Sequence, residues 1–128
     1  MNRSSDWLNQ AKSDLKAAKN LVQTADYAWG CFLCQQAAEK ALKSMGEKNN
    51  IIIWGHDLVD IMKELKVKIT FPQSIENYCK ILNLYYITTR YPDAFISGYP
   101  SEKFSQNLTE DAIKYAEEVI EFAIKKIT

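Results

Sequence analysis

Apolar residues recur every three or four positions along most of the chain, which is the spacing of one face of an α-helix. The first such stretch follows Ser4 and Ser5, either of which can cap a helix. It ends where residues 24–26 (TAD) interrupt the pattern. Its apolar positions are Trp7, Leu8, Ala11, Leu15, Ala18, Leu21 and Val22. The pattern predicts an amphipathic first helix with one buried stripe.

A second helix is predicted from Tyr27 to about Glu47, with Asp26 as its N-cap and Gly46 near its end. One face carries Cys31, Cys34, Ala38, Ala41 and Met45, and an adjacent stripe carries Phe32, Gln35, Glu39 and Leu42. The two cysteines are three residues apart, but no second pair of cysteine or histidine residues completes four zinc ligands. Cys31 and Cys34 are therefore interpreted as small buried residues, and no metal site is expected.

The middle of the chain predicts two further helices. Residues 49–55 (NNIIIWG) form a connector, and a third helix starts near His56 and Asp57. After a break over residues 66–74, Ser74 can cap a fourth helix that reaches about Arg90. No second strand-like run exists to pair with the apolar connector, so a β-sheet is not expected.

A long connection and a last helix complete the chain. Pro92 ends the fourth helix, because proline has no N–H and disfavours a helical residue before it. Four aromatic residues within the connection 91–108 predict that it packs on the protein, and Thr109 opens the last helix. The expected fold is all-α: an antiparallel up-and-down bundle of four to five helices, forming one domain over residues 1–128.

Composition narrows the class of protein. The 128 residues are 47% hydrophobic and 25% charged, which is ordinary for a globular domain. No apolar run approaches the roughly 18 residues of a membrane span, and the N-terminus lacks an apolar signal core. Three cysteines do not suggest a secreted disulfide scaffold. A cytoplasmic protein without membrane partners is expected.

Sixteen basic and sixteen acidic side chains cancel, which excludes a strongly basic nucleic-acid-binding domain. The balance differs along the chain: residues 1–48 carry seven basic and five acidic side chains, and residues 91–128 carry four and seven. A phosphate site is therefore expected near the second helix and the end of the fourth, and not on the acidic last helix.

Four segments resemble the HEPN domain family (higher eukaryotes and prokaryotes nucleotide-binding) in order and spacing. They are DWLNQAKSDLKAAKNL (6–21), CFLCQQAAEKALKSM (31–45), HDLVDIMKEL (56–65) and YYITTRYPD (85–93). The resemblance implies a helical bundle that usually forms two-fold dimers and is often paired with a small nucleotidyltransferase as toxin and antitoxin. Many members are metal-independent ribonucleases that use an Arg followed four to six residues later by His.

That ribonuclease signature is absent here. Arg90 is followed by YPDAFISG, and the single histidine, His56, lies upstream. The resemblance makes Arg90 and His56 the best candidates for a variant catalytic pair, and it leaves open whether the protein is an enzyme. No cofactor is implied.

Arg90 is expected at a helix C-terminus, where its guanidinium could hold a phosphate. The structural alternative is an Arg90 that caps its helix and pairs with Asp93. Tyr91 and Asp93 are ligand-binding candidates with Arg90, and the surrounding tyrosines could stack a base or pack the connection. His56 has its own structural alternative, as a neutral residue at a helix start.

The polar face of the second helix supplies two more ligand-binding candidates, Gln36 and Lys43. The alternative there is a solvated face with an ordinary Glu39–Lys43 pair. Three functions remain open: a dimeric nucleotide-binding or nucleotidyltransferase-partner module, a metal-independent endoribonuclease toxin with a variant site, and a non-catalytic scaffolding bundle. The expected partners are a second copy, a nucleotidyltransferase, and a nucleotide or RNA.

Overall fold

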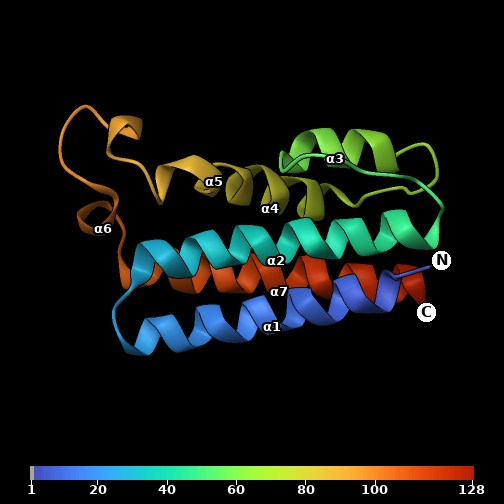
Figure 1. Cartoon of the computed structure of the whole chain (residues 1–128), viewed down its shortest axis with the longest axis horizontal. Helices are drawn as coiled ribbons and strands as arrows, with labels where there is room; N and C mark the ends of the chain where they lie inside the picture. The colour runs from blue at the N-terminus through green and yellow to red at the C-terminus, as the bar shows by residue number, and fades with distance from the viewer. Residues whose placement is uncertain (1) are drawn as a thin grey trace.

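Four helical segments run alternately up and down in the computed structural model, which describes residues 2–128 (Figure 1). They are α1 (Ser4–Gln23), α2 (Tyr27–Lys48), α4 (Gln73–Asn83) continued by α5 (Tyr85–Thr88), and α7 (Gln106–Ile127). The short α3 (Leu58–Leu65) lies beside α2 and α4. Every regular element in the described part of the chain is helical, which confirms the all-α bundle.

Small residues bring α2 and α7 together along the middle of the bundle. Both helices point in the same direction, because they are the second and fourth segments of the up-and-down series (Figure 1). A Cβ atom on Gly30 would lie only 2.6 Å from Cγ2 of Thr109, so this crossing requires glycine. Both helices also carry fully or nearly fully buried alanines: Ala37, Ala38, Ala41, Ala112, Ala116 and Ala123.

Larger apolar residues from the other helices fill the space around this contact. The predicted stripe of α1 contributes Leu8, Ala11, Leu15 and Ala18, while α3 and α4 contribute Leu58, Ile61, Met62, Leu65, Ile75 and Leu82. Cys31, Cys34 and Cys79 are buried and free, which confirms the interpretation of the first two as core residues. The third helix starts where it was predicted, and Asp57 caps it, since its carboxylate accepts the N–H groups of Val59 and Asp60.

Two predicted caps and two predicted boundaries were wrong. Arg3 precedes α1 and Pro72 precedes α4, so the predicted caps Ser4, Ser5 and Ser74 lie inside these helices. The fourth helix does not run unbroken from Ser74 to Arg90, because it is interrupted at Leu84 between α4 and α5. The last helix begins at Gln106 and not at Thr109. Ser105 caps it by accepting the N–H of Leu108, while the buried Thr109 hydroxyl donates to the carbonyl of Tyr27 at 2.9 Å.

The connection 91–108 is ordered into a 3-10 turn, η1 (Pro92–Ala94), and a short helix, α6 (Pro100–Lys103). Its four aromatic residues divide into two pairs. Phe95 and Phe104 are half-buried, and Phe104 packs edge-on against Tyr85, whereas Tyr91 and Tyr99 are exposed. Only part of the aromatic content therefore holds the connection to the bundle.

Candidate functional site

Arg90 follows α5 and is surrounded by aromatic rings. Its guanidinium carbon lies 4.5 Å from the ring centres of Phe32 and Tyr86 and 4.9 Å from that of Tyr91. Phe32 comes from α2, so the arginine joins two helices that are far apart in the sequence. Each such cation–π contact is worth about 0.5–1 kcal/mol at an exposed site.

Hydrogen bonds also hold the guanidinium in place. Nε donates to the carbonyl oxygen of Tyr86 at 2.7 Å, Nη2 donates to the same oxygen, and Nη1 donates to the hydroxyl of Tyr91 at 3.5 Å. The predicted capping role of Arg90 is therefore present. Since a guanidinium carries five N–H groups, an N–H on each Nη nitrogen remains for a ligand such as phosphate.

In the described part of the chain, residues 2–128, Asp93 does not form an ion pair with Arg90. It lies in η1 with its side chain exposed, and the ion pairs of the described chain do not include it. The alternative in which Arg90 and Asp93 form a pair across the turn was wrong. The guanidinium instead points towards the carbonyl of Tyr86, which is the unsatisfied acceptor at the end of its helix.

His56 precedes α3 and lies between a carboxylate and an aromatic ring. Its Nδ1 is 3.0 and 3.1 Å from the two carboxylate oxygens of Glu39. Its ring stacks on Tyr86, with centroids 4.9 Å apart and planes inclined by 16°. Tyr86 is therefore in contact with both His56 and Arg90, the two predicted catalytic residues.

Glu39 is a buried carboxylate with several donors around it. Its side chain is 4% exposed, yet it accepts from Lys43 Nζ at 3.1 Å and from Gln35 Nε2 at 3.5 Å in addition to its contact with His56. Gln35 also donates to the carbonyl of His56 at 3.1 Å. A buried charge needs such partners, and here they tie the start of α3 to the middle of α2.

Gln36 extends this polar cluster towards α1. Its amide nitrogen donates to Gln35 Oε1 at 2.8 Å, and its oxygen accepts from Lys40 Nζ at 3.3 Å. Lys40 in turn is 2.6 Å from Asp14 on α1. Gln36 thus lies within a structural network that links the two helices, and both ends of its amide are engaged by other side chains.

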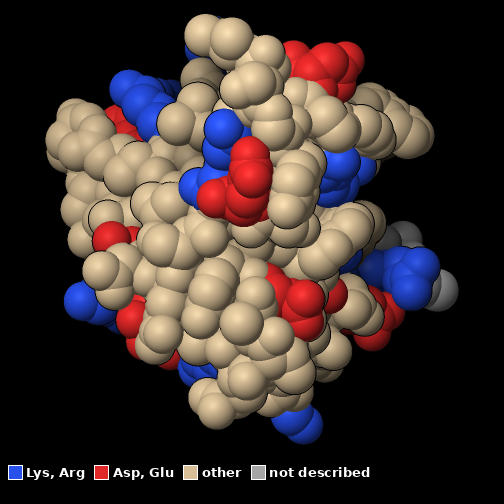
Figure 2. Space-filling view, turned by 90° about the vertical axis from the view of Figure 1, so that its left-hand side faces the viewer, with Lys and Arg blue, Asp and Glu red and all other residues tan. Residues whose placement is uncertain are grey.

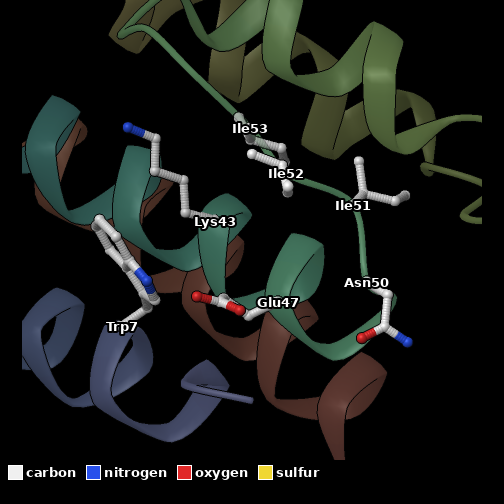
Figure 3. A pocket seen from close by; sticks show the side chains of 7 residues that line it. All are labelled: Trp7, Lys43, Glu47, Asn50, Ile51, Ile52 and Ile53. Atoms are coloured by element: carbon white, nitrogen blue, oxygen red, sulfur yellow. The ribbon is translucent and has the colours of Figure 1, made fainter. Parts of the chain in front are cut away.

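Lys43 is engaged in two directions. Besides its bond to Glu39, its ammonium group lies 5.5 Å from the ring centre of Trp7 on α1. It lines a hollow of about 330 Å³ between α1, α2 and the connector (Figure 3). The residues around that hollow are Trp7, Lys43, Glu47, Asn50, Ile51, Ile52 and Ile53. Lys43 therefore lines a different recess from His56.

The recess on the side of His56 is lined by His56, Asp57, Asn83, Tyr86 and Ile87, with a volume of about 340 Å³. Exposed large side chains lie before, on and after α5, namely Leu84, Ile87 and Tyr91, and Ile87 also lines the recess. Figure 2 looks onto the end of the molecule where α5 and α6 lie; acidic and basic side chains alternate there around a broad uncharged area. This end of the protein offers no extended basic surface.

The three cysteine thiols are buried, and the potential metal ligands of the described residues are not grouped. Within residues 2–128 there is no group of three His, Cys, Asp or Glu residues that could hold a metal ion. Burial raises the pKa of the Cys31 thiol to about 11 and that of Cys79 to about 12, so both remain protonated and unreactive near neutral pH. No helix of the described chain is long and apolar enough to cross a membrane.

The structure places Tyr91 beside Arg90 and puts the Tyr86 ring in contact with both Arg90 and His56. Within the described residues, Asp93, Gln36 and Lys43 form no hydrogen bond or ion pair with Arg90. Sequence reasoning omitted two residues from the site. Glu39 had a visible signal, since it is a charged residue placed between Ala38 and Ala41 on the apolar side of α2. Tyr86 had no sequence signal beyond its position four residues before Arg90.

Three comparisons place this geometry among known proteins. The family model described as the HEPN domain matches residues 4–127. TT1696 from Thermus thermophilus has a crystal structure with a TM-score of 0.94 and 37% identity, covering 98% of this chain and 99% of that chain. ST0689, described as an archaeal HEPN homologue, has a TM-score of 0.83 and 30% identity over the full length of both chains.

Two more distant similarities agree. A HEPN domain protein of Thermotoga maritima superposes with a TM-score of 0.75 at 31% identity, covering 94% of this chain and 95% of that chain. A Methanocaldococcus jannaschii protein named "Putative toxin MJ1304" is 28% identical over 124 residues, which are 90% of this chain and 82% of that protein.

Proposed function

Because the chain belongs to the HEPN domain family, we propose that it is a nucleotide-binding module of a toxin–antitoxin type system that acts as a homodimer with a nucleotidyltransferase partner. The toxin assignment draws on the name of the Methanocaldococcus relative. A cytoplasmic location is part of the same proposal.

One observation carries the binding function: Arg90 is held rigidly but not saturated. Three of its five N–H groups are used by Tyr86 and Tyr91, and the remaining two can bind phosphate oxygens. The aromatic rings around it offer a stacking surface for a base. A phosphate-bearing aromatic ligand matches both features.

Titration calorimetry with ATP, GTP and a short RNA tests this function. Arg90→Gln should weaken binding at least tenfold, because a charge-assisted contact to phosphate is lost. Arg3→Gln is the matched control, since Arg3 is the other arginine of the chain and pairs only with the exposed Asp6. Equal affinities of the two variants would contradict a role for Arg90.

The homodimer is proposed from the family and from the apolar residues beside the site. Leu84 and Ile87 on the outer side of the α4–α5 segment are exposed although both are large and apolar. Pairing of two copies along this segment would cover them and place two Arg90 residues near one another. Light scattering at micromolar concentration should give twice the 14.7 kDa mass of the chain, and a monomer would remove this part of the proposal.

A second candidate, metal-independent cleavage of RNA, is favoured by the contact between His56 and Glu39. A histidine whose Nδ1 is held by a carboxylate resembles the base of a catalytic triad. It would take the proton of a ribose 2′-hydroxyl as that oxygen attacks the adjacent phosphate and the bond from phosphorus to the 5′-oxygen of the next nucleotide breaks. The products would be a 2′,3′-cyclic phosphate and a 5′-hydroxyl, which takes its proton from water, and Arg90 would stabilise the charge that develops on the phosphate. Cleavage in the presence of EDTA that is lost in both His56→Ala and Arg90→Ala would support it. Variants that cleave RNA as well as the wild type does, or a wild type that does not cleave RNA, would exclude it.

The third function, a scaffolding bundle, predicts a different result for Arg90→Gln. If Arg90 only caps its helix, Arg90→Gln should lower the free energy of unfolding without changing any binding. Chemical denaturation of Arg90→Gln beside the calorimetry therefore separates the scaffold from the proposed module.

A further inference from the structure

Glu39 occupies an unusual place among the polar residues of α2. It is 4% exposed, but it reaches the surface of the protein through one neighbour, the imidazole of His56, whose side chain is 52% exposed. Its other two donors, Lys43 and Gln35, are themselves largely or fully buried. Any effect of the Glu39 carboxylate on a ligand at the surface is therefore exerted through the His56 imidazole.

The direction of the hydrogen bond follows from the chemistry of the two groups. A carboxylate has only acceptor sites, so the Nδ1 that lies 3.0 and 3.1 Å from its oxygens must carry the hydrogen. In a neutral imidazole the other nitrogen, Nε2, then has a lone pair and no hydrogen. Lys43 Nζ, at 3.1 Å from Oε2, is a further donor to the same carboxylate.

Two further contacts limit the movement of the His56 ring. Its face rests on Tyr86, and its backbone carbonyl accepts a hydrogen bond from Gln35 at 3.1 Å. Rotation of the ring would break the contact with Glu39 and the stacking with Tyr86 together. The tautomer and the orientation of the imidazole are therefore set by the same few neighbours.

We propose that Glu39 is a positioning residue that fixes His56 in the Nδ1–H tautomer, so that Nε2 meets a ligand as a hydrogen-bond acceptor. The matching ligand group is a donor such as a ribose hydroxyl, next to the anion bound by Arg90. This identification of the ligand group rests on the proposed nucleotide function, whereas the tautomer is a property of the free protein.

The single histidine makes the tautomer directly measurable. In protein labelled with ¹⁵N, long-range proton–nitrogen correlation spectra contain one pair of imidazole nitrogens, which are those of His56. At a pH well above the ordinary titration range of imidazole, Nδ1 should have the resonance of a protonated nitrogen and Nε2 that of a bare one. The reverse assignment, or an imidazolium with both nitrogens protonated, would overturn the proposal.

Glu39→Gln supplies the second half of the test. The amide that this substitution introduces can accept from Nδ1 through its oxygen or donate to it through its nitrogen, so the two ring resonances should converge towards a mixture of tautomers. Glu47→Gln is the matched control, because it makes the same change two turns further along α2. Glu47 lines the hollow beside Trp7 and not the recess of His56, so this substitution should leave the spectrum of His56 unchanged. An unaltered tautomer in Glu39→Gln would show that the carboxylate does not set it.

The spectra are recorded without any ligand, so they separate this proposal from the nucleotide function. A Nδ1–H tautomer that depends on Glu39 supports the positioning role even if calorimetry detects no nucleotide binding. Normal nucleotide binding combined with the opposite tautomer would leave the module in place and refute the role of Glu39.

Discussion

The imidazole of His56 lies nearly flat on the phenol ring of Tyr86, with centroids 4.9 Å apart. The guanidinium of Arg90 is 4.5 Å from the centre of the same ring. Tyr86 is consequently the physical link between two residues that are 34 positions apart in the chain. Its ring contacts an imidazole and a guanidinium at the same time, and it lines the recess that His56 also lines.

Removal of the Tyr86 ring should disturb the imidazole of His56 and the guanidinium of Arg90 at once. Tyr86→Ala is expected to weaken nucleotide binding about tenfold. The stacking and cation–π contacts that orient His56 and Arg90, worth about 1–2 kcal/mol, are lost in this variant. Tyr86→Phe keeps the ring and the backbone carbonyl that Arg90 contacts, and its affinity should match that of the wild type. Calorimetry on the two variants checks this, and a loss in Tyr86→Phe would assign the effect to the hydroxyl instead.

The acceptor role of His56 predicts a preference among ligands. A nucleotide with a ribose hydroxyl should bind more tightly than its deoxy analogue, by about tenfold for one hydrogen bond made in a partly buried site. Glu39→Gln should reduce that preference while leaving the affinity for the deoxy analogue nearly unchanged. Paired titrations with adenosine 3′-phosphate and its 2′-deoxy form measure this, and an equal loss for both ligands would contradict a selective effect.

The contact between α2 and α7 predicts a large effect for a small substitution. Gly30→Ala places a methyl group 2.6 Å from Cγ2 of Thr109, so overpacking should lower the free energy of unfolding by about 1–3 kcal/mol. Thr109→Ser removes that Cγ2 while keeping the hydroxyl that donates to Tyr27. The double variant should therefore recover part of the loss, and strictly additive destabilisation in urea would refute this explanation.

The three cysteines should resist alkylation in the folded protein. Burial raises the pKa of the thiols, to about 11 for Cys31 and about 12 for Cys79, and raises that of Cys34 further still. Little thiolate is therefore present at pH 8. Mass spectrometry should find no iodoacetamide adduct on native protein and three adducts after unfolding.

The same shifts make stability fall at alkaline pH. Thiols in the unfolded chain lose their protons near the ordinary value of 9.0, whereas the folded chain keeps that of Cys31 up to about 11. The unfolded state is therefore favoured progressively as the pH rises above about 9. Urea unfolding at pH 8 and pH 10 should show the decrease, and replacement of Cys34 by Ala should reduce it.

The ion pair between Lys40 and Asp14 should matter more than the exposed pairs. The side chains are 21% and 10% exposed, so Lys40→Met leaves a largely buried carboxylate with one fewer partner. A loss of about 1–3 kcal/mol is expected in urea unfolding. Lys19→Met, which removes the exposed pair with Glu117, should change stability by less than about 1 kcal/mol.

Much of the fold could be predicted from the spacing of apolar residues. The stripe Leu8, Ala11, Leu15 and Ala18 has helical periodicity that local sequence alone displays, and Asp57 carries a capping preference that needs no tertiary information. The start of the last helix was misplaced because Ser105 and Thr109 are both good caps in isolation. Tertiary packing decides between them, since Thr109 is buried against Tyr27.

The site was less accessible to sequence reasoning. Arg90 and His56 were identified because they are chemically distinctive and lie in family-like segments. The contact between His56 and Glu39 spans 17 positions and depends on how the connector returns along α2, which no local pattern encodes. The expected Arg90–Asp93 pair was plausible at three residues' separation, but a helix-end carbonyl competed for the guanidinium.

The polar side chains that link Asp14 on α1 to Glu39 on α2 have a consequence for the cooperativity of the molecule. Lys40, Gln36 and Gln35 form an unbroken series of hydrogen bonds between these two carboxylates. We therefore expect the surroundings of His56 to open together with the N-terminal helix. Amide hydrogen exchange near the start of α3 should slow or accelerate together with exchange in the middle of α1.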